Sequence, residues 1–184
     1  MRREFRFPGP RSPIPDRAMN RARAQGWAFW IGIALSLLLM LMPLPAMIQP
    51  LKPYWPALVL IYWSLEATDR VSVGLAFCTG LAADLLNGAL LGDQALRLAV
   101  LVFIALRFRS RLRFFPMWQQ ALAVWLLLLN NHVLQALIRA FAGAPAMPAL
   151  SWLAPAVGAA IWPFVFLLLD DVNTRVRGKS AKST

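Results

Sequence analysis

The sequence predicts an all-α integral membrane protein, a single bundle of about six transmembrane helices. Hydrophobic residues make up 59% of the 184 residues and charged residues only 15%, whereas a soluble domain usually carries about 25% charge. The segment 71–91 has no proline and one formal charge, and at ~1.5 Å per residue it reaches about 31 Å, enough to cross a hydrocarbon core of ~30 Å. A chain of this length has no room for a sizeable soluble domain beside the bundle.

The segment 71–91 is expected to form the centre of the bundle. It carries or adjoins several glycines, and small residues let membrane helices approach closely. Its one carboxylate is expensive in lipid unless it is paired, protonated or facing a wet cavity, so we expect it to face inward. The predicted packing or partner-docking surface of this helix comprises Gly80, Asp84, Gly88 and Gly92.

Residues 1–26 are predicted to form a basic cytoplasmic tail, because they hold seven arginines and four prolines with almost no apolar periodicity. The tail either touches anionic lipid or a cytoplasmic partner, or only anchors the topology. The first apolar span runs from Trp27 to about Met42 and is closed by Pro43 and Pro45. No convincing small-x-small cleavage site follows it, which favours an uncleaved helix.

Two apolar segments are too short to cross a membrane by themselves. Only 13 residues separate Lys52 from Glu66, roughly 20 Å of helix, and the segment from Ala95 to Leu106 is similarly short. Such segments either span with snorkelling ends or re-enter to build a cavity. Six crossings are expected in the first case and four in the second.

Charges and prolines predict the remaining segments. The alternating arginines of segment 107–115 are expected to form a cytoplasmic loop, and Pro116 to occupy the first position of a helix that ends near Ile138. The last span, 152–169, contains Pro155 and Pro163, which predict a kink. The transmembrane domain thus covers 27–171, and a short basic cytoplasmic tail covers 172–184.

Charge places both termini in the cytoplasm. With six crossings, the cytoplasmic segments hold seven basic residues before position 27, Arg70, four between Arg107 and Arg113, and four in the C-terminal tail, out of 19 in the chain. Lys52, Arg97 and Arg139 remain for the outer side. Cytoplasmic loops of membrane proteins are enriched in such residues, so the net charge of +11 indicates orientation and anionic-lipid contact rather than nucleic-acid binding.

Most intramembrane polar residues fall at one depth of this layout, in its outer half. They form either a polar cavity that opens outward or a set of interhelical hydrogen bonds with an Asp84–Arg97 ion pair. The predicted cavity residues are Asn87, Arg97, Asn131, His132 and Gln135.

The chain lacks the patterns of an enzyme or a metal protein. It has one cysteine and one histidine, which excludes a disulfide framework, a thiolate site and a multi-histidine centre. The stretch GLAAD has half of the carboxylate motif of phosphatidyl-alcohol transferases. The second aspartate of that motif is missing, because the position four residues later is Gly88. No nucleophile elbow is present. We therefore expect a protein with neither catalytic residues nor a cofactor.

Three stretches together resemble the MreD family of rod shape-determining proteins in its proteobacterial form: YWPALVLIYW (54–63), GLAADLLNGALLG (80–92) and RLRFFPMWQQALAV (111–124). The chain departs from the family pattern at Tyr54, where an acidic residue is expected, and at Asn87, where an apolar one is expected. Asp84, Gly88 and Gly92 match the pattern of the central helix. The residues that match its cytoplasmic loop are Arg111, Arg113, Phe115, Pro116, Trp118 and Gln119.

The resemblance implies a non-enzymatic scaffold in the bacterial inner membrane, multi-pass and with cytoplasmic termini. Its implied partners are the bitopic MreC, the MreB filament (indirectly), and the transpeptidase and glycosyltransferase of peptidoglycan synthesis. The implied fold is similar to the six-helix substrate-binding subunits of vitamin transporters. Arg111 and Arg113 are expected to face lipid phosphates or an acidic partner.

Two other functions stay open at this point. One is a small-molecule-binding transporter subunit that uses a polar cavity around Asp84 and Asn131. The other is a membrane anchor whose active part is the arginine-rich tail.

Overall fold

The computed structural model describes residues 16–43, 45, 47–67, 69–88 and 90–182. All regular secondary structure in these ranges is helical, as predicted, and one α-helix corresponds to each of the six predicted segments. The elements are α1 (Asp16–Leu41), η1 (Gln49–Leu51), α2 (Trp55–Glu66), α3 (Val73–Asn87), α4 (Asp93–Leu112), α5 (Met117–Phe141), η2 (Ala149–Leu153) and α6 (Ala154–Lys182), where η denotes a 3-10 helix.

The centre of the fold is α2. All ten residues from Pro56 to Leu65 are buried, and the helix packs against α1, α4, α5 and α6. A helix that is apolar all round belongs in an interior, and its 12 residues reach only about 18 Å. The expectation that 71–91 forms the centre is therefore wrong.

In contrast, α3 lies at the margin of the described bundle and packs mainly on α4. Only five of its residues are buried, on the face toward α4: Ala76, Thr79, Gly80, Ala83 and Asp84. The helix is also shorter than predicted, because the chain turns at Gly88 and Gly92, which adopt positive φ angles of 59° and 100°. Its 15 residues reach about 22 Å.

The arginine-rich segment after Leu106 is a continuation of α4, which corrects the predicted loop. The helix ends only at Leu112 and contains 20 residues, about 30 Å, so it is not a short segment. Arginine is a good helix former, and Nε of Arg109 donates to the carbonyl oxygen of Leu65 at 3.1 Å. This bond satisfies one of the carbonyls left open at the end of α2.

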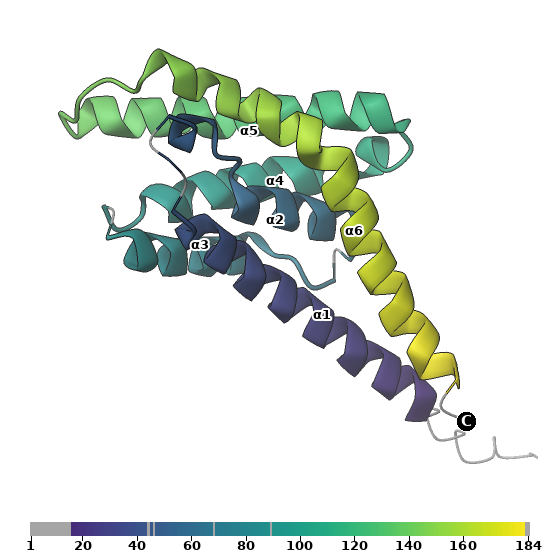
Figure 1. The fold of residues 1–184 in the computed structure, drawn as a ribbon. Helices are drawn as coiled ribbons and strands as arrows, with labels where there is room; N and C mark the ends of the chain where they lie inside the picture. Colours follow the sequence, from purple (N-terminus) through teal and green to yellow (C-terminus); the bar gives the residue numbers. More distant parts are fainter. Residues whose placement is uncertain (1–15, 44, 46, 68, 89, 183–184) are drawn as a thin grey trace, which may run out of the picture.

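The predicted tails are also partly helical. α1 begins at Asp16 and not at Trp27, and α6 continues past Asp171 to Lys182; the first 15 residues lie outside the described part. α1 ends at Leu41, ahead of Pro43, as predicted. Pro163 lies inside α6, and Figure 1 shows this helix changing direction part-way along its length.

The helix ends fall on two opposite sides of the molecule. Figure 1 shows the start of α1 and the end of α6 together at the lower right, and the turn from α4 to α5 lies on the same side. The connections from α3 to α4 and from α5 to α6 lie on the opposite side. This arrangement puts the two ends of the described bundle on one side.

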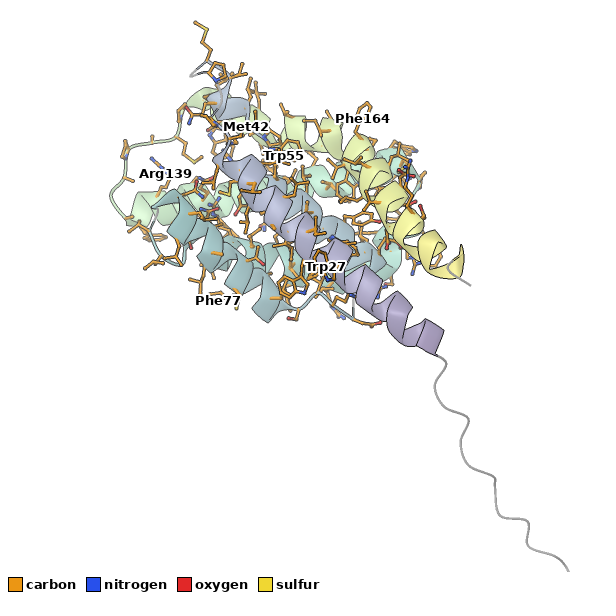
Figure 2. All side chains as sticks on the ribbon, turned by 60° about the horizontal axis from the view of Figure 1, so that its bottom comes forward. Trp27, Met42, Trp55, Phe77, Arg139 and Phe164 are labelled. Atoms are coloured by element: carbon orange, nitrogen blue, oxygen red, sulfur yellow. The ribbon has the colours of Figure 1, made fainter. Side chains whose placement is uncertain are left out.

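The outer surface of the described bundle is apolar. Met117–Phe141 and Ala149–Arg175 are each long and apolar enough to cross a membrane. Large apolar side chains on other helices are also exposed, among them Trp27 (73%) on α1 and Phe77 (42%) on α3, with Phe164 (75%) on α6 (Figure 2). Contiguous apolar surface of this kind marks contact with lipid or with a partner.

Candidate functional site

Asp84 is fully buried, with an exposed fraction of 0%, and it caps α4 from the neighbouring helix. Its Oδ2 accepts from the backbone N–H groups of Gly92 (2.9 Å) and Ala95 (3.4 Å), and its Oδ1 accepts from that of Gln94 (3.0 Å). The first N–H groups of a helix have no partner inside the helix, and the helix dipole favours a negative charge there. Asp84 thus faces inward as predicted, and the backbone of α4 supplies its hydrogen bonds.

Arg97 pairs with Asp93 rather than with Asp84, so the predicted Asp84–Arg97 ion pair is wrong. Nη2 of Arg97 lies 3.0 Å from Oδ2 of Asp93, one helical turn earlier, and its Nε donates to the Asp93 carbonyl oxygen at 3.3 Å. The guanidinium carbon lies 5.5 Å from the ring centroid of Tyr54, an attractive cation–π arrangement. Tyr54 therefore contacts Arg97 through its ring.

The glycines of the stretch GLAADLLNGALLG (80–92) have two different roles. Gly80 packs directly on α4: a Cβ atom at this position would overlap the backbone of Ala95. Gly88 and Gly92 have no neighbour within 4 Å of such a Cβ, and they serve the turn through their left-handed conformations. Gly80 is buried between two helices of the same chain, so the four predicted residues do not form one exposed docking surface.

Gly88→Ala is expected to lower the free energy of unfolding by about 1–2 kcal/mol, because a Cβ is strained in the left-handed region. Gly88→Asn is expected to cost less, since asparagine visits this conformation more readily. The measurement is the thermal unfolding midpoint of the purified chain in detergent. Equal midpoints for wild type and both variants would contradict the conformational role of Gly88.

The five predicted cavity residues surround one cavity of about 440 Å³. Its walls come from the end of α1, the η1 region, the ends of α3 and α5, and the starts of α4 and α6. The polar residues of its lining that the sequence placed there are Asn87, Arg97, Asn131, His132 and Gln135. Asp84 does not line it, so the geometry does not support the transporter alternative built on Asp84.

Several lining residues had not been singled out as part of the cavity. Lys52 lies in the connection before α2, and its Nζ donates to the carbonyl oxygens of Met40 and Met42 at the end of α1. Burial lowers the pKa of Lys52 below the usual value of a lysine. Tyr54 donates to Oε1 of Gln94 at 3.0 Å. Lone polar residues in connections carry no periodic signal, which is why sequence reasoning did not add them to the cavity.

His132 and Asn87 have contacts within the cavity wall. Nε2 of His132 lies 3.5 Å from Oγ of Ser151, and its ring meets Trp152 edge to face at 5.0 Å. Asn87 donates to the carbonyl oxygen of Ala83 at 2.7 Å. These contacts position both side chains without involving a charged partner.

Interhelical hydrogen bonds, the other expectation for polar side chains, also occur away from the cavity. Nε1 of Trp162 donates to Oε1 of Gln120 at 3.3 Å and joins α6 to α5. Nδ2 of Asn173 donates to the hydroxyl of Tyr62 at 3.5 Å and joins α6 to α2. Polar side chains therefore both line the cavity and join helices, and His132 does both through its contact with Ser151.

The residues that match the cytoplasmic-loop pattern surround the turn from α4 to α5. Pro116 is the residue before the first turn of α5, one position earlier than predicted. Trp118 is 68% exposed. All except the partly buried Gln119 are exposed: Arg111, Arg113, Phe115, Pro116 and Trp118. In the described part of the chain, neither Arg111 nor Arg113 has a carboxylate partner.

Comparison with known proteins gives a concordant result. Residues 22–172 match the family model of the rod shape-determining protein MreD. The chain belongs to the MreD family. The rod shape-determining protein MreD of Haemophilus influenzae is 33% identical over 143 residues, which cover 78% of this chain and 88% of that protein. MreD membership supports a role in rod shape determination. No solved structure matches the chain, so the similarity to vitamin-transporter subunits stays a prediction.

The three MreD-like stretches correspond to three structural units, all inside the matched range. The first forms Tyr54 and the buried helix α2. The second forms the junction of α3 and α4, with Gly80, Asp84 and Gly92. The third forms the α4–α5 turn and the start of α5.

Proposed function

We propose that this MreD protein is a non-enzymatic scaffold of the cell-elongation complex in the bacterial inner membrane. In this proposal it binds an MreC-type bitopic protein and connects the cytoplasmic MreB filament, indirectly, to the transpeptidase and glycosyltransferase that build peptidoglycan. The family match over 151 of the 184 residues (22–172) carries the proposal. A scaffold needs an exposed surface for its partners rather than a catalytic centre. The buried carboxylate of Asp84 accepts from three backbone N–H groups of the described bundle, which is a structural role.

The exposed apolar surface supports both membrane insertion and partner binding. Exposed aromatic and aliphatic side chains occur on α1, α3, α4, α5 and α6, whereas α2 is enclosed. Lipid or the transmembrane helix of a partner would cover such a surface, because both present hydrocarbon to it. Because Gly80 is covered by α4, the partner helix is expected on an outer face of the bundle.

The charges support a six-span orientation with both termini in the cytoplasm. Arg70 and Arg113 belong to connections on the side where α1 starts and α6 ends, and Arg111 lies in the last turn of α4 on that side. Lys52 and Arg139 lie at the opposite side. In the cytoplasm, the exposed arginines of the α4–α5 turn would meet anionic lipid headgroups or an acidic partner.

Single-cysteine labelling tests this orientation. In a Cys78→Ser background, Ala146→Cys in the α5–η2 connection is expected to react with a membrane-impermeant maleimide on intact spheroplasts. Asp69→Cys, its matched control between α2 and α3, is expected to react only after permeabilisation; both native residues are exposed in the described structure. Labelling of Asp69→Cys in intact spheroplasts would contradict the orientation.

Co-purification tests the scaffold itself. The tagged full chain is extracted from its own membranes in a mild detergent, and associated proteins are identified by mass spectrometry. Enrichment of MreC-like and wall-synthase subunits is expected, relative to an unrelated inner-membrane protein of similar size with the same tag. Recovery of an ATPase pair or a bound small molecule, without any wall-synthesis protein, would overturn the proposal.

A further inference from the structure

The cavity described above has both polar and apolar residues in its lining. Along α5 it extends from Arg139, near the connection to η2 (Figure 2), to Leu128, eleven residues or about 16 Å of helix. The apolar residues of its lining include Leu128, Met40, Met147, Ala154 and Pro155. Its volume of about 440 Å³ falls in the range of ligand-binding cavities.

The cavity carries an excess of positive charge. Lys52, Arg97 and Arg139 line it against a single carboxylate, Asp93. Asp93 is engaged by Arg97, whereas Lys52 and Arg139 donate only to carbonyl oxygens. Within the described ranges neither of these two cations has a carboxylate within ion-pair distance, so the cavity holds two uncompensated cationic side chains.

Three polar atoms of residues that line the cavity are buried without a partner in the described structure: Nε of Arg139, Oδ1 of Asn131 and Oδ1 of Asp93. Asn131 is only 4% exposed. A buried polar group without a partner is costly, and more so when the group is charged. An oxyanion would accept from the guanidinium of Arg139, and a hydroxyl on the same ligand would donate to Asn131.

We propose that this cavity binds a phosphate group, with Lys52 and Arg139 as its charged contacts and the apolar lining residues as the contacts of an attached hydrocarbon or carbon skeleton. Arginine and lysine are the side chains that recognise phosphate, arginine through its planar fork of donors. The phosphate belongs either to a lipid headgroup or to a soluble compound. The site does not depend on the scaffold function, since it lies within one chain.

Ligand-induced stabilisation of the purified full chain in a neutral maltoside detergent tests the site. The probes are two lipids and one inorganic ion. The lipids are phosphatidylglycerol, which has a phosphodiester and hydroxyl groups, and phosphatidylcholine. The ion is inorganic phosphate, compared with chloride at equal ionic strength. A ligand that binds only the folded state raises the unfolding midpoint. Phosphatidylglycerol but not phosphatidylcholine is expected to raise it if the ligand is a lipid, and inorganic phosphate is expected to raise it if the ligand is soluble.

The variants Lys52→Gln and Arg139→Gln are expected to raise the half-saturating concentration of the active probe about tenfold or more, because each removes a charge-assisted hydrogen bond. Arg175→Gln, which removes an arginine that lies outside the cavity and pairs with Asp171, is the matched control and is expected to leave it unchanged. If Arg139→Gln does not fold, Arg139→Lys replaces it and is expected to weaken binding through the loss of the fork. No stabilisation by any probe, or equal binding by wild type and both cavity variants, would overturn the proposal.

Discussion

Gly80→Ala is expected to destabilise the bundle by about 1–3 kcal/mol, the usual cost of overpacking, or more. The added methyl group would overlap the backbone N and Cα of Ala95 at the start of α4. Backbone cannot move aside as a flexible side chain can, so α3 and α4 must separate. The separation also draws Asp84, one helical turn after Gly80, away from the N–H groups that it caps.

Gly74→Ala is the matched control, because it makes the same change in the same helix. A Cβ at Gly74 would meet only Oγ of Ser72, at 3.9 Å, and alanine is the better helix former. This variant is expected to be neutral or slightly stabilising. Thermal unfolding in detergent compares the two variants. A Gly80→Ala midpoint as high as that of Gly74→Ala would contradict the close packing of α3 on α4.

The all-helical class and the approximate positions of the six α-helices could be predicted from the sequence, because apolar segments and the prolines between them indicate where helices form. The centre of the bundle could not. Composition favoured the segment around Asp84, since it is long and glycine-rich, whereas burial is decided by how many neighbours surround a helix. The short stretch YWPALVLIYW is apolar on every face, and in retrospect this all-round pattern was the signal for α2.

The cavity shows a similar division. The common depth of the intramembrane polar residues predicted that these side chains would gather, and they line one cavity. The hydrogen-bond or ion-pair partner of each side chain could not be predicted, because pairing depends on differences in distance of about one ångström. Two carboxylates precede Arg97, Asp84 in α3 and Asp93 at the start of α4, and in the structure Arg97 pairs with Asp93, on its own helix. Glycines likewise look alike in sequence, although Gly80 serves packing and Gly88 serves a turn.

Asp84→Asn is expected to lower the free energy of unfolding by about 2–4 kcal/mol, because three backbone N–H groups lose a charged acceptor and one of them faces an NH₂ group instead. The loss should appear as a lower unfolding midpoint and a lower level of the inserted protein. Asp171→Asn is the matched control. Asp171 forms an exposed pair with Arg175 on α6, and exposed pairs contribute little to stability, so its midpoint should stay near that of wild type.

The same variant separates a structural carboxylate from a functional one. If Asp84 acts through the cap of α4, every property that depends on the folded bundle, including partner recovery and the stabilisation by a phosphate probe, should decline together as the protein level declines. If Asp84 contacted a ligand directly, binding would be lost while the unfolding midpoint stayed unchanged or rose, since removal of a buried charge from an unused site relieves its desolvation cost. The three N–H donors around its carboxylate favour the first outcome, because they leave no strong reason for a ligand to replace them.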